Sequence, residues 1–249
     1  MQPATQLKFQ RFEFKYHVPK HRVPLIKEDL FSHRMQWDPY VLDKEKKSYT
    51  VTSLYFDNSS WSCFYDKESG VEERAKLRFR IYEPRLSGND TIFLEIKQKH
   101  DAVTSKKRVI VPHEAYGRFL ETRRLSSILP FIEEASRSAF CEILAFGEFN
   151  CLYPRMLVQY EREPLMWEFN DRLRITFDHD IKAGAANTLD AGSMLPVLRR
   201  NVIMEVKYNS VLPYWFEDIV RKYELAREPF SKYGRSVESW GRYNSLSFA

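Results

Sequence analysis

The segment RAKLRFRIY, residues 74–82, alternates cations with apolar side chains at the two-residue period of a β-strand. One face of such a strand carries Lys76, Arg78, Arg80 and Tyr82. The other face carries Leu77, Phe79 and Ile81. This pattern predicts a strand that packs one face on a core and presents a row of positive charges on the other.

Two further segments repeat the pattern. TIFLEIKQKH, residues 91–100, places on one face Glu95, Lys97 and Lys99. TSKKRVIV, residues 104–111, places Lys106 and Arg108 on one face. The turn residues Gly88-Asn89-Asp90 predict a hairpin between the first two strands. If the three strands are antiparallel neighbours, their charged faces combine into one electropositive surface suited to an extended polyanion.

An ordinary solvated sheet face is the alternative interpretation, and it is the better one for any strand taken alone. The set of strands argues against it. Like charges placed opposite each other destabilise a sheet, and arginine, whose planar fork fits phosphate oxygens, is frequent here. The set therefore predicts anion binding.

Composition permits a sizeable core in one or two domains, since 43% of the 249 residues are hydrophobic and 15% are aromatic. Lys plus Arg exceed Asp plus Glu by 39 to 34, a formal charge of +5. The three widely spaced cysteines favour neither a disulfide framework nor a zinc site. The six histidines show no metal-ligand spacing. No Walker-type loop, GxGxxG motif or Ser-His-Asp set stands out.

The amino-terminal residues contain no apolar signal region, and no run is long enough to cross a bilayer. We expect a soluble, cytoplasmic protein without a transmembrane segment, to which a membrane protein could bind in trans. The sequence leaves the oligomeric state open.

Strand patterns recur along the chain with helical patterns between them. Strands are predicted at residues 7–18, 49–56, 74–82, 91–100, 104–111, 155–162, 171–181 and 201–210. One helix is predicted at 19–33, two or three helices within 112–148 and one at 213–226, and loops are predicted at 37–47 and 182–200. An α+β fold follows, and closing the sheet would turn its charges into a lumen while helices pack outside.

The succession FEFKYHV, YTVTSLYFD, GVEERAKLRFRIY, FLEIKQK, SKKRVIV, LYPRMLVQYER, DRLRITFDHDI, VIMEVKY and FSKYG resembles the VTC domain. This is a polyphosphate polymerase domain of the CYTH, or triphosphate tunnel metalloenzyme, superfamily. The resemblance runs from about residue 9 to residue 237 and implies one tunnel domain over residues 1–249. It implies a closed, antiparallel eight-stranded β-barrel whose basic interior holds a triphosphate or polyphosphate together with Mn²⁺ or Mg²⁺.

The resemblance assigns roles by motif position. The catalytic positions it implies are Arg78, Arg80, Lys97, Arg162, Arg174 and Lys232. Further phosphate-binding positions are Lys15, Lys76, Lys99, Lys106, Arg108 and Lys207, of which Lys106 or Arg108 takes the KxR position. Glu205 is the implied metal ligand. For Glu95 and Glu13, metal binding and charge balance with neighbouring cations are equally good interpretations. The first strand carries Arg11 where the phosphatase branches have the first carboxylate of ExExK, which is closer to the polymerase branch.

Three activities fit these residues. The first is a metal-dependent phosphotransferase that moves the γ-phosphate of ATP onto a growing polyphosphate chain. The second is a metal-dependent triphosphatase for inorganic or organic triphosphates, and the third is a non-catalytic module that binds polyphosphate or another polyanion. Nucleic-acid binding is disfavoured, because aromatic residues are not expected to interleave with the cations on their face.

Overall fold

The computed structural model describes residues 11–71, 74–100, 103–190, 192–209 and 211–246. The chain forms two compact units, and each is described by itself. Unit 1 comprises the residues up to Ser48 together with Arg162–His179 and Arg200–Pro229. Unit 2 comprises Tyr49–Glu161, Asp180–Arg199 and the residues from Phe230 onward. That the chain is one domain over residues 1–249 stays a prediction.

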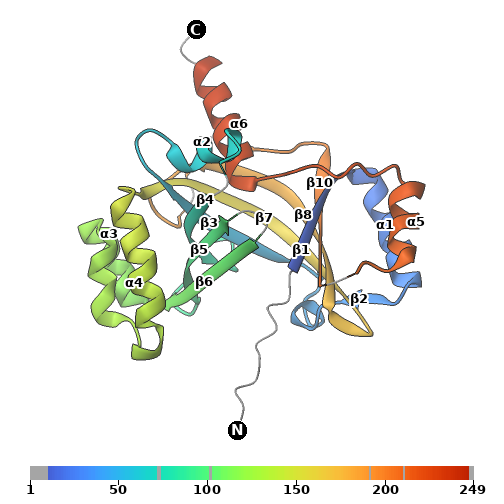
Figure 1. The fold of residues 1–249 in the computed structure, drawn as a ribbon, viewed down its shortest axis with the longest axis horizontal. Helices are drawn as coiled ribbons and strands as arrows, with labels where there is room; N and C mark the ends of the chain where they lie inside the picture. The colour runs from blue at the N-terminus through green and yellow to red at the C-terminus, as the bar shows by residue number, and fades with distance from the viewer. Residues whose placement is uncertain (1–10, 72–73, 101–102, 191, 210, 247–249) are drawn as a thin grey trace. The chain divides into compact units, whose positions relative to one another are not determined.

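Runs of antiparallel strands and runs of helices follow one another along the chain, which confirms the α+β class (Figure 1). The strands are β1 Arg11–Pro19, β2 Met35–Trp37, β3 Tyr49–Asp57, β4 Arg74–Ile81, β5 Ile92–His100, β6 Val103–Val111, β7 Tyr153–Trp167, β8 Asn170–Ala185, β9 Leu195–Pro196 and β10 Asn201–Asn209. The α-helices are α1 Val23–Ser32, α2 Ser62–Glu68, α3 His113–Thr122, α4 Glu134–Phe149, α5 Tyr214–Lys222 and α6 Lys232–Leu246. Short 3₁₀ helices are η1 Lys20–Arg22, η2 Pro39–Val41 and η3 Leu125–Phe131. No helix within the described ranges is both long and apolar enough to span a membrane.

The strands form one large antiparallel sheet in the order β1-β10-β8-β7-β3-β4-β5-β6. Within the described residues this path ends at β1 and β6, so the prediction of a closed barrel is wrong for this structure. The edge of β1 is instead hydrogen-bonded to another segment, since Tyr16 bridges Arg227 and the amide of Glu228 donates to the carbonyl of Lys15 at 3.0 Å. Alternation predicts the faces of a strand, but it carries no information on which edges pair.

Unit 1 packs α1 and α5 on the apolar face of β1, β10 and β8. Ile26 and Leu30 of α1 and Phe216 and Ile219 of α5 are buried at helical spacing. A proline lies in the first turn of α1, and Pro213 precedes α5, where its missing N–H costs no hydrogen bond. Both helices were predicted from the sequence, and both are confirmed.

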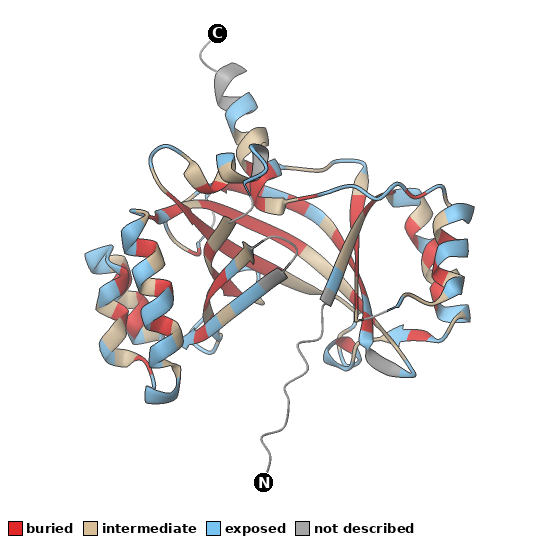
Figure 2. Ribbon diagram, in the orientation of Figure 1, coloured by how far each residue is buried: buried red, intermediate tan, exposed pale blue. Residues whose placement is uncertain are grey.

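Unit 2 places the apolar faces of β4, β5 and β6 against α3, η3 and α4, whose buried residues Figure 2 marks. Phe79 of β4 is fully buried and contacts the rings of Phe56, Tyr116 and Phe119 at centroid distances of 5.1–5.4 Å. The helices predicted within residues 112–148 are confirmed. Helix α6 was not predicted. It begins where Ser231 Oγ accepts from the amide of Gly234 at 3.1 Å, as a helix N-cap does.

Candidate functional site

Three neighbouring strands of unit 2 align the predicted cations in rows. Arg78 of β4 lies opposite Glu95 of β5, and Glu95 lies opposite Arg108 of β6. One row further along, Lys97 lies between Lys76 and Lys106, which makes a row of three ammonium groups. The strands are therefore the antiparallel neighbours that the sequence predicts, and their charged side chains share one face.

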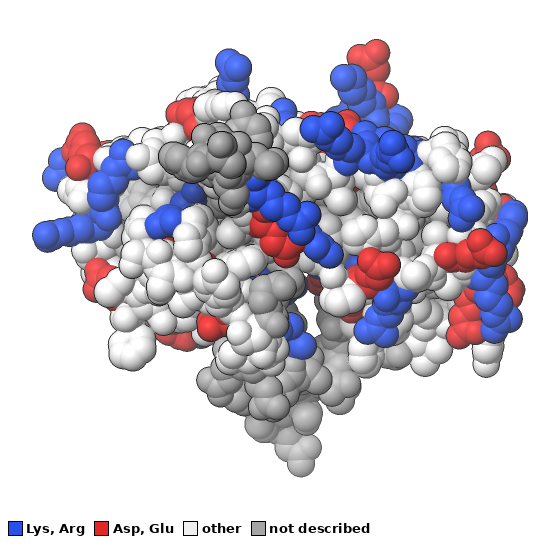
Figure 3. Space-filling model, turned by 90° about the horizontal axis from the view of Figure 1, so that it is seen from above, with Lys and Arg blue, Asp and Glu red and all other residues white. Residues whose placement is uncertain are grey.

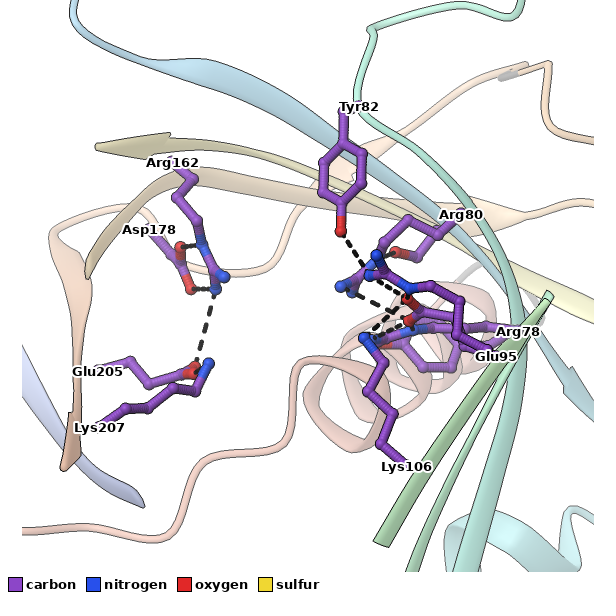
Figure 4. Close-up of polar contacts among 12 residues, drawn as sticks. Arg78, Arg80, Tyr82, Glu95, Lys106, Arg162, Asp178, Glu205 and Lys207 are labelled. Atoms are coloured by element: carbon purple, nitrogen blue, oxygen red, sulfur yellow. Dashed lines mark hydrogen bonds and ion pairs between the residues drawn. The ribbon is translucent and has the colours of Figure 1, made fainter. Parts of the chain in front are cut away.

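Glu95 is at the centre of these cations (Figure 4). Its side chain is 1% exposed, and its carboxylate accepts from Arg78 at 2.7 Å and from Lys106 at 2.8 Å. Arg108 also donates to it, and Arg80 lies 3.8 Å away. Burial alone would raise the pKa of Glu95, but Arg78, Arg80 and Lys106 outweigh burial and hold the pKa well below its usual range. Its oxygens are thus occupied by cations, which fits charge balance better than metal binding.

Two of the guanidinium groups also donate hydrogen bonds to side-chain hydroxyl groups. Arg80 is buried and donates to Ser53 Oγ at 3.0 Å, and Arg78 donates to the hydroxyl of Tyr55 at 2.8 Å. Burial would raise the pKa of Tyr55, but the charges of Arg78, Arg80 and Lys232 lower it to about 8. These hydrogen bonds therefore fix both arginines in place and leave part of their positive charge unneutralised.

The remaining cations of unit 2 are less uniformly placed. Lys76 donates to Ser231 Oγ at 2.7 Å, and Lys232 lies 4.6 Å from the ring centroid of Tyr160. Lys97 is exposed, and Lys99 lies opposite residue 104. The side chain of Lys106 is 41% exposed. Partial burial and the charges of Arg108 and Arg78 lower the pKa of Lys106 to about 8 against the opposing effect of Glu95.

Lys232 is the first residue of α6, and a buried hydrogen bond fixes that end of the helix. The hydroxyl of Tyr233 donates to Asp57, a fully buried carboxylate at the end of β3. Asp57 also accepts from the backbone amides of Cys63 and Phe64 at 3.0 and 3.1 Å, so it caps α2 as well. Burial raises the pKa of Tyr233 far above its usual value, and the negative charge of Asp57 raises it further.

Aromatic rings lie beside the cations at one end of this face. The guanidinium of Arg108 is 4.3 Å from the ring centroid of Phe93 and donates to the hydroxyl of Tyr82 at 2.7 Å. The expectation that aromatic residues do not interleave with the cations is therefore wrong at this end. Cross-strand register decides which side chains meet, and the sequence of one strand does not contain it.

Unit 1 holds the other predicted residues, and there cations and carboxylates alternate. Lys15 lies opposite Glu205, and Glu13 lies opposite Lys207. The ion pairs join Lys15 to Glu13 at 2.9 Å, Lys207 to Glu205, Arg174 to Asp38 at 3.0 Å, and Arg162 to Asp178 at 2.7 Å with a second N–H at 2.9 Å. Each of these cations therefore has a carboxylate partner, unlike the cation-rich set of unit 2.

Carboxylates also surround the ammonium group of Lys15. Its burial alone lowers the pKa, but the charges of Glu205, Glu13 and Asp178 outweigh that effect and raise it. No group of three or more His, Cys, Asp or Glu side chains in the described part of the chain is arranged to hold a metal ion. Mg²⁺ usually takes only one or two protein carboxylates and completes its shell with water and phosphate oxygens. Glu205 and Glu13 are carboxylates of that kind, and in this structure Lys207 and Lys15 pair with them.

Several residues at these sites were not singled out as functional from the sequence. They are Ser53, Tyr55, Asp57, Phe93 and Asp178. Phe93 had a signal, because it stands two residues before Glu95 and so shares its face. Asp178 had a weaker signal, because it falls on the same face of its strand as Arg172 and Arg174, and its partner Arg162 lies on another strand.

The model of the VTC domain family matches residues 10–241 of the chain. The chain belongs to the VTC domain family. This VTC domain is similar in structure to a putative adenylyl cyclase from Hippeastrum described as having a dominant triphosphatase activity. The TM-score is 0.51 at 12% sequence identity, over 92% of this chain and 95% of the other, and this likeness shows the fold alone.

Two other solved structures are similar to this VTC domain with lower TM-scores. A putative adenylate cyclase from Bacillus halodurans has a TM-score of 0.49 at 13% identity, over 89% of this chain and 95% of the other. A protein from Pyrococcus horikoshii OT3 has a TM-score of 0.47 at 14% identity, over 92% and 99%. No curated protein matches the sequence of this chain at a significant level.

Proposed function

We propose that this VTC domain is a metal-dependent phosphotransferase that moves the γ-phosphate of ATP onto a growing polyphosphate chain. The observation that carries the proposal is the Glu95-centred set of cations on β4, β5 and β6. One carboxylate there meets four cations, which leaves an excess of positive charge for phosphate oxygens. On the outer face drawn in Figure 3, by contrast, Lys and Arg side chains lie among Asp and Glu side chains.

The reaction makes few demands on protein side chains beyond placement and charge. A loose phosphoryl-transfer transition state spreads negative charge over its equatorial oxygens, which preorganised cations stabilise. Arg78 and Arg80 are held by Ser53, Tyr55 and Glu95, so they meet that charge without first reorganising. The terminal oxygen of a polyphosphate chain is already anionic, so no side chain needs to remove a proton from it.

Lys97 and Lys106 supply positive charge at the accessible part of the same face. Their flexible ammonium groups suit successive phosphates of a chain better than one fixed geometry does. In unit 1, Glu205 and Glu13 are the residues that would hold Mn²⁺ or Mg²⁺, and the ion, when bound, would neutralise phosphate charge.

Hydrolysis is the second candidate activity, because a water molecule can replace the polyphosphate end as acceptor. The Hippeastrum protein is described as having triphosphatase activity. The phenol of Tyr55 favours it for this chain, because its lowered pKa of about 8 leaves more of it as phenolate near neutral pH than an ordinary tyrosine has, and a phenolate can accept a proton. Against it is Arg11, which stands where the phosphatase branches carry a carboxylate.

One incubation separates these activities. The purified protein is mixed with ATP and MnCl₂, and the products are resolved by gel electrophoresis and by a phosphate assay. A ladder of long polymer supports the polymerase, and free phosphate alone supports the triphosphatase. If the protein binds tripolyphosphate but forms neither product, the result supports the non-catalytic binding module.

Matched variants test whether the activity lies on the cationic face, which is the charged face of β4, β5 and β6. Arg78→Ala and Arg80→Ala should each lower turnover by a hundredfold or more, about 2.7 kcal/mol of transition-state stabilisation. Arg118→Ala is the control, since Arg118 is an exposed arginine of α3 that pairs with Glu121. Full turnover in Arg78→Ala and Arg80→Ala would exclude this face as the site.

A further inference from the structure

The cationic face of unit 2 ends in an aromatic patch, defined here as Tyr49, Tyr82, Phe93 and Ile110. Arg80 lies opposite Phe93, and Phe93 lies opposite Ile110. The neighbouring row, two residues along each strand, is the charged row of Arg78, Glu95 and Arg108. One step along the sheet therefore replaces the charged groups of β5 and β6 with apolar ones on the same face, while Arg80 keeps a cation on β4.

The rings of this patch contact one another and the last cation. Tyr82 meets Tyr49 and Phe93 edge-on, each at a centroid distance of 5.7 Å. The guanidinium of Arg108 lies 4.3 Å from the centroid of Phe93. Arg108 thus joins the two regions, because it donates to Glu95 on one side and to Tyr82 on the other.

The patch is accessible, unlike the core on the opposite face of the same strands. Ile110 is 60% exposed, and Tyr49, Tyr82 and Phe93 are half-buried. Leu77, Leu94 and Val109, on the core face, are at most 2% exposed. An apolar, ring-rich surface that continues directly from a set of phosphate-binding cations matches a ligand that is anionic at one end and flat and aromatic at the other.

We propose that the aromatic patch binds the nucleobase of a nucleoside triphosphate whose phosphates lie on Arg78, Arg80 and Arg108. This proposal rests on the proposed function and names the part of the site that tells ATP from an inorganic polyphosphate. Bases stack on aromatic rings and on arginine planes, and both surfaces are present here. Tyr82 directly follows β4 and is four residues from Arg78, about 13 Å at the rise of an extended strand. A ribose and its phosphates span such a distance.

The test compares two ligands that share the phosphates and differ in the base. Dissociation constants for ATP and for inorganic tripolyphosphate are measured by calorimetry on the full chain, with MnCl₂ at fixed concentration. The quantity of interest is the ratio of the tripolyphosphate constant to the ATP constant. Phe93→Leu and Tyr82→Leu each remove one ring and keep an apolar side chain, so each should lower this ratio about tenfold.

Two control variants isolate stacking from other effects. Tyr82→Phe keeps the ring and loses the hydroxyl that accepts from Arg108, so it should shift both constants together and leave the ratio within twofold. Tyr65→Leu changes an exposed tyrosine of α2 and should alter neither constant. The proposal would be overturned if the ratio stayed unchanged in both Phe93→Leu and Tyr82→Leu. This holds whether the variants bind both ligands equally more weakly or bind both as the wild type does.

The outcome is separable from that of the polymerase assay. If the ratio falls in the leucine variants while wild-type protein makes no polymer, the base subsite stands and the polymerase proposal fails. If polymer forms and the ratio does not change, the patch has no role in nucleotide binding and the polymerase proposal stands.

Discussion

Arg78 and Glu95 lie directly opposite each other on β4 and β5, and two N–H groups of Arg78 meet Glu95 Oε2 at 2.9 and 2.7 Å. Glu95 also accepts from Lys106 and Arg108, so one buried carboxylate holds three cations by hydrogen bonds. Without the negative charge of Glu95, these cations should repel one another and destabilise the folded protein. A bound polyanion should neutralise them again.

Glu95→Gln should lower the free energy of unfolding by about 3 kcal/mol, because Arg78 and Arg80 lose their buried counter-charge. Inorganic tripolyphosphate should restore most of that loss, since its oxygens can replace the carboxylate and it binds only the folded state. Thermal and urea unfolding at pH 7, with and without the ligand, measure both effects. Glu142→Gln, which removes an exposed partner of Lys107, should change stability by less than about 0.5 kcal/mol. Unfolding curves for Glu95→Gln that tripolyphosphate does not move would contradict this assignment.

The affinity for tripolyphosphate should fall as the pH rises from 7 to 9. In the folded protein the pKa values of Lys106 and Tyr55 are both lowered to about 8, so one positive charge is lost and one negative charge is gained. The contribution of these two groups to stability should move the other way. Their ordinary pKa values are 10.5 and 10.0, so at these two sites the unfolded chain binds more protons from about pH 8 upward, and their contribution to the free energy of unfolding rises with pH. The raised pKa values of Cys63 and Tyr233 oppose this contribution above about pH 9.

The double variant Lys106→Arg with Tyr55→Phe has neither titrating group and should lose clearly less affinity for tripolyphosphate between pH 7 and 9 than the wild type does. Calorimetric titrations at several pH values, at constant ionic strength, make the comparison. A profile as steep as that of the wild type would assign the pH dependence to other groups.

Asp178→Asn should destabilise the protein by about 3 kcal/mol or more. Asp178 is fully buried, and Arg162, whose side chain is 12% exposed, donates to both of its oxygens. The neutral amide leaves a largely buried guanidinium without its main counter-charge. Asp218→Asn on the exposed side of α5 should leave the urea midpoint unchanged. Equal midpoints for the two variants would show that the Arg162–Asp178 pair contributes nothing to stability.

Tyr233→Phe should cost about 1–3 kcal/mol of stability, because buried Asp57 loses a hydrogen-bond donor. It should also weaken tripolyphosphate binding, since Lys232 and Tyr233 are neighbours in the first turn of α6. The matched control is Tyr153→Phe, which removes an exposed hydroxyl that accepts from Arg155. Undiminished tripolyphosphate affinity in Tyr233→Phe would show that Lys232 does not need this anchor, or does not bind phosphate.

The strands of unit 2 could be predicted because their alternation is strict. Lys76, Arg78 and Arg80 share a face in any extended strand, and the structure places them so. The closed barrel could not be predicted in the same way, because closure depends on which edges pair. Here Arg227 and Glu228 pair with the edge of β1. Helix α6 was not predicted because its polar, glycine-containing sequence is weakly helical. Its start is fixed by the local cap of Ser231 and by the hydrogen bond from Tyr233 to Asp57, which is distant in sequence.

The candidate site, like the fold, was predictable within single strands and not between strands. Cations that face the same way within one strand were predictable, and so was Glu95 as their carboxylate. The partners that hold them were not, because Tyr55, Ser53 and Asp178 come from other strands through a register that no single segment contains. Phe93 was within reach of the same alternation argument, since it falls on the face of Glu95.

The central claim is that the face of β4, β5 and β6 binds condensed phosphate through Arg78 and Arg80, and titration of the protein with inorganic tripolyphosphate tests it most directly. Wild-type protein should bind with an affinity that falls steeply with salt, and Arg78→Gln with Arg80→Gln should weaken binding about a hundredfold or more. Arg118→Gln, at the exposed arginine of α3, should bind as the wild type does. Equal affinities in wild type and the double variant, or no binding by the wild type, would contradict the account.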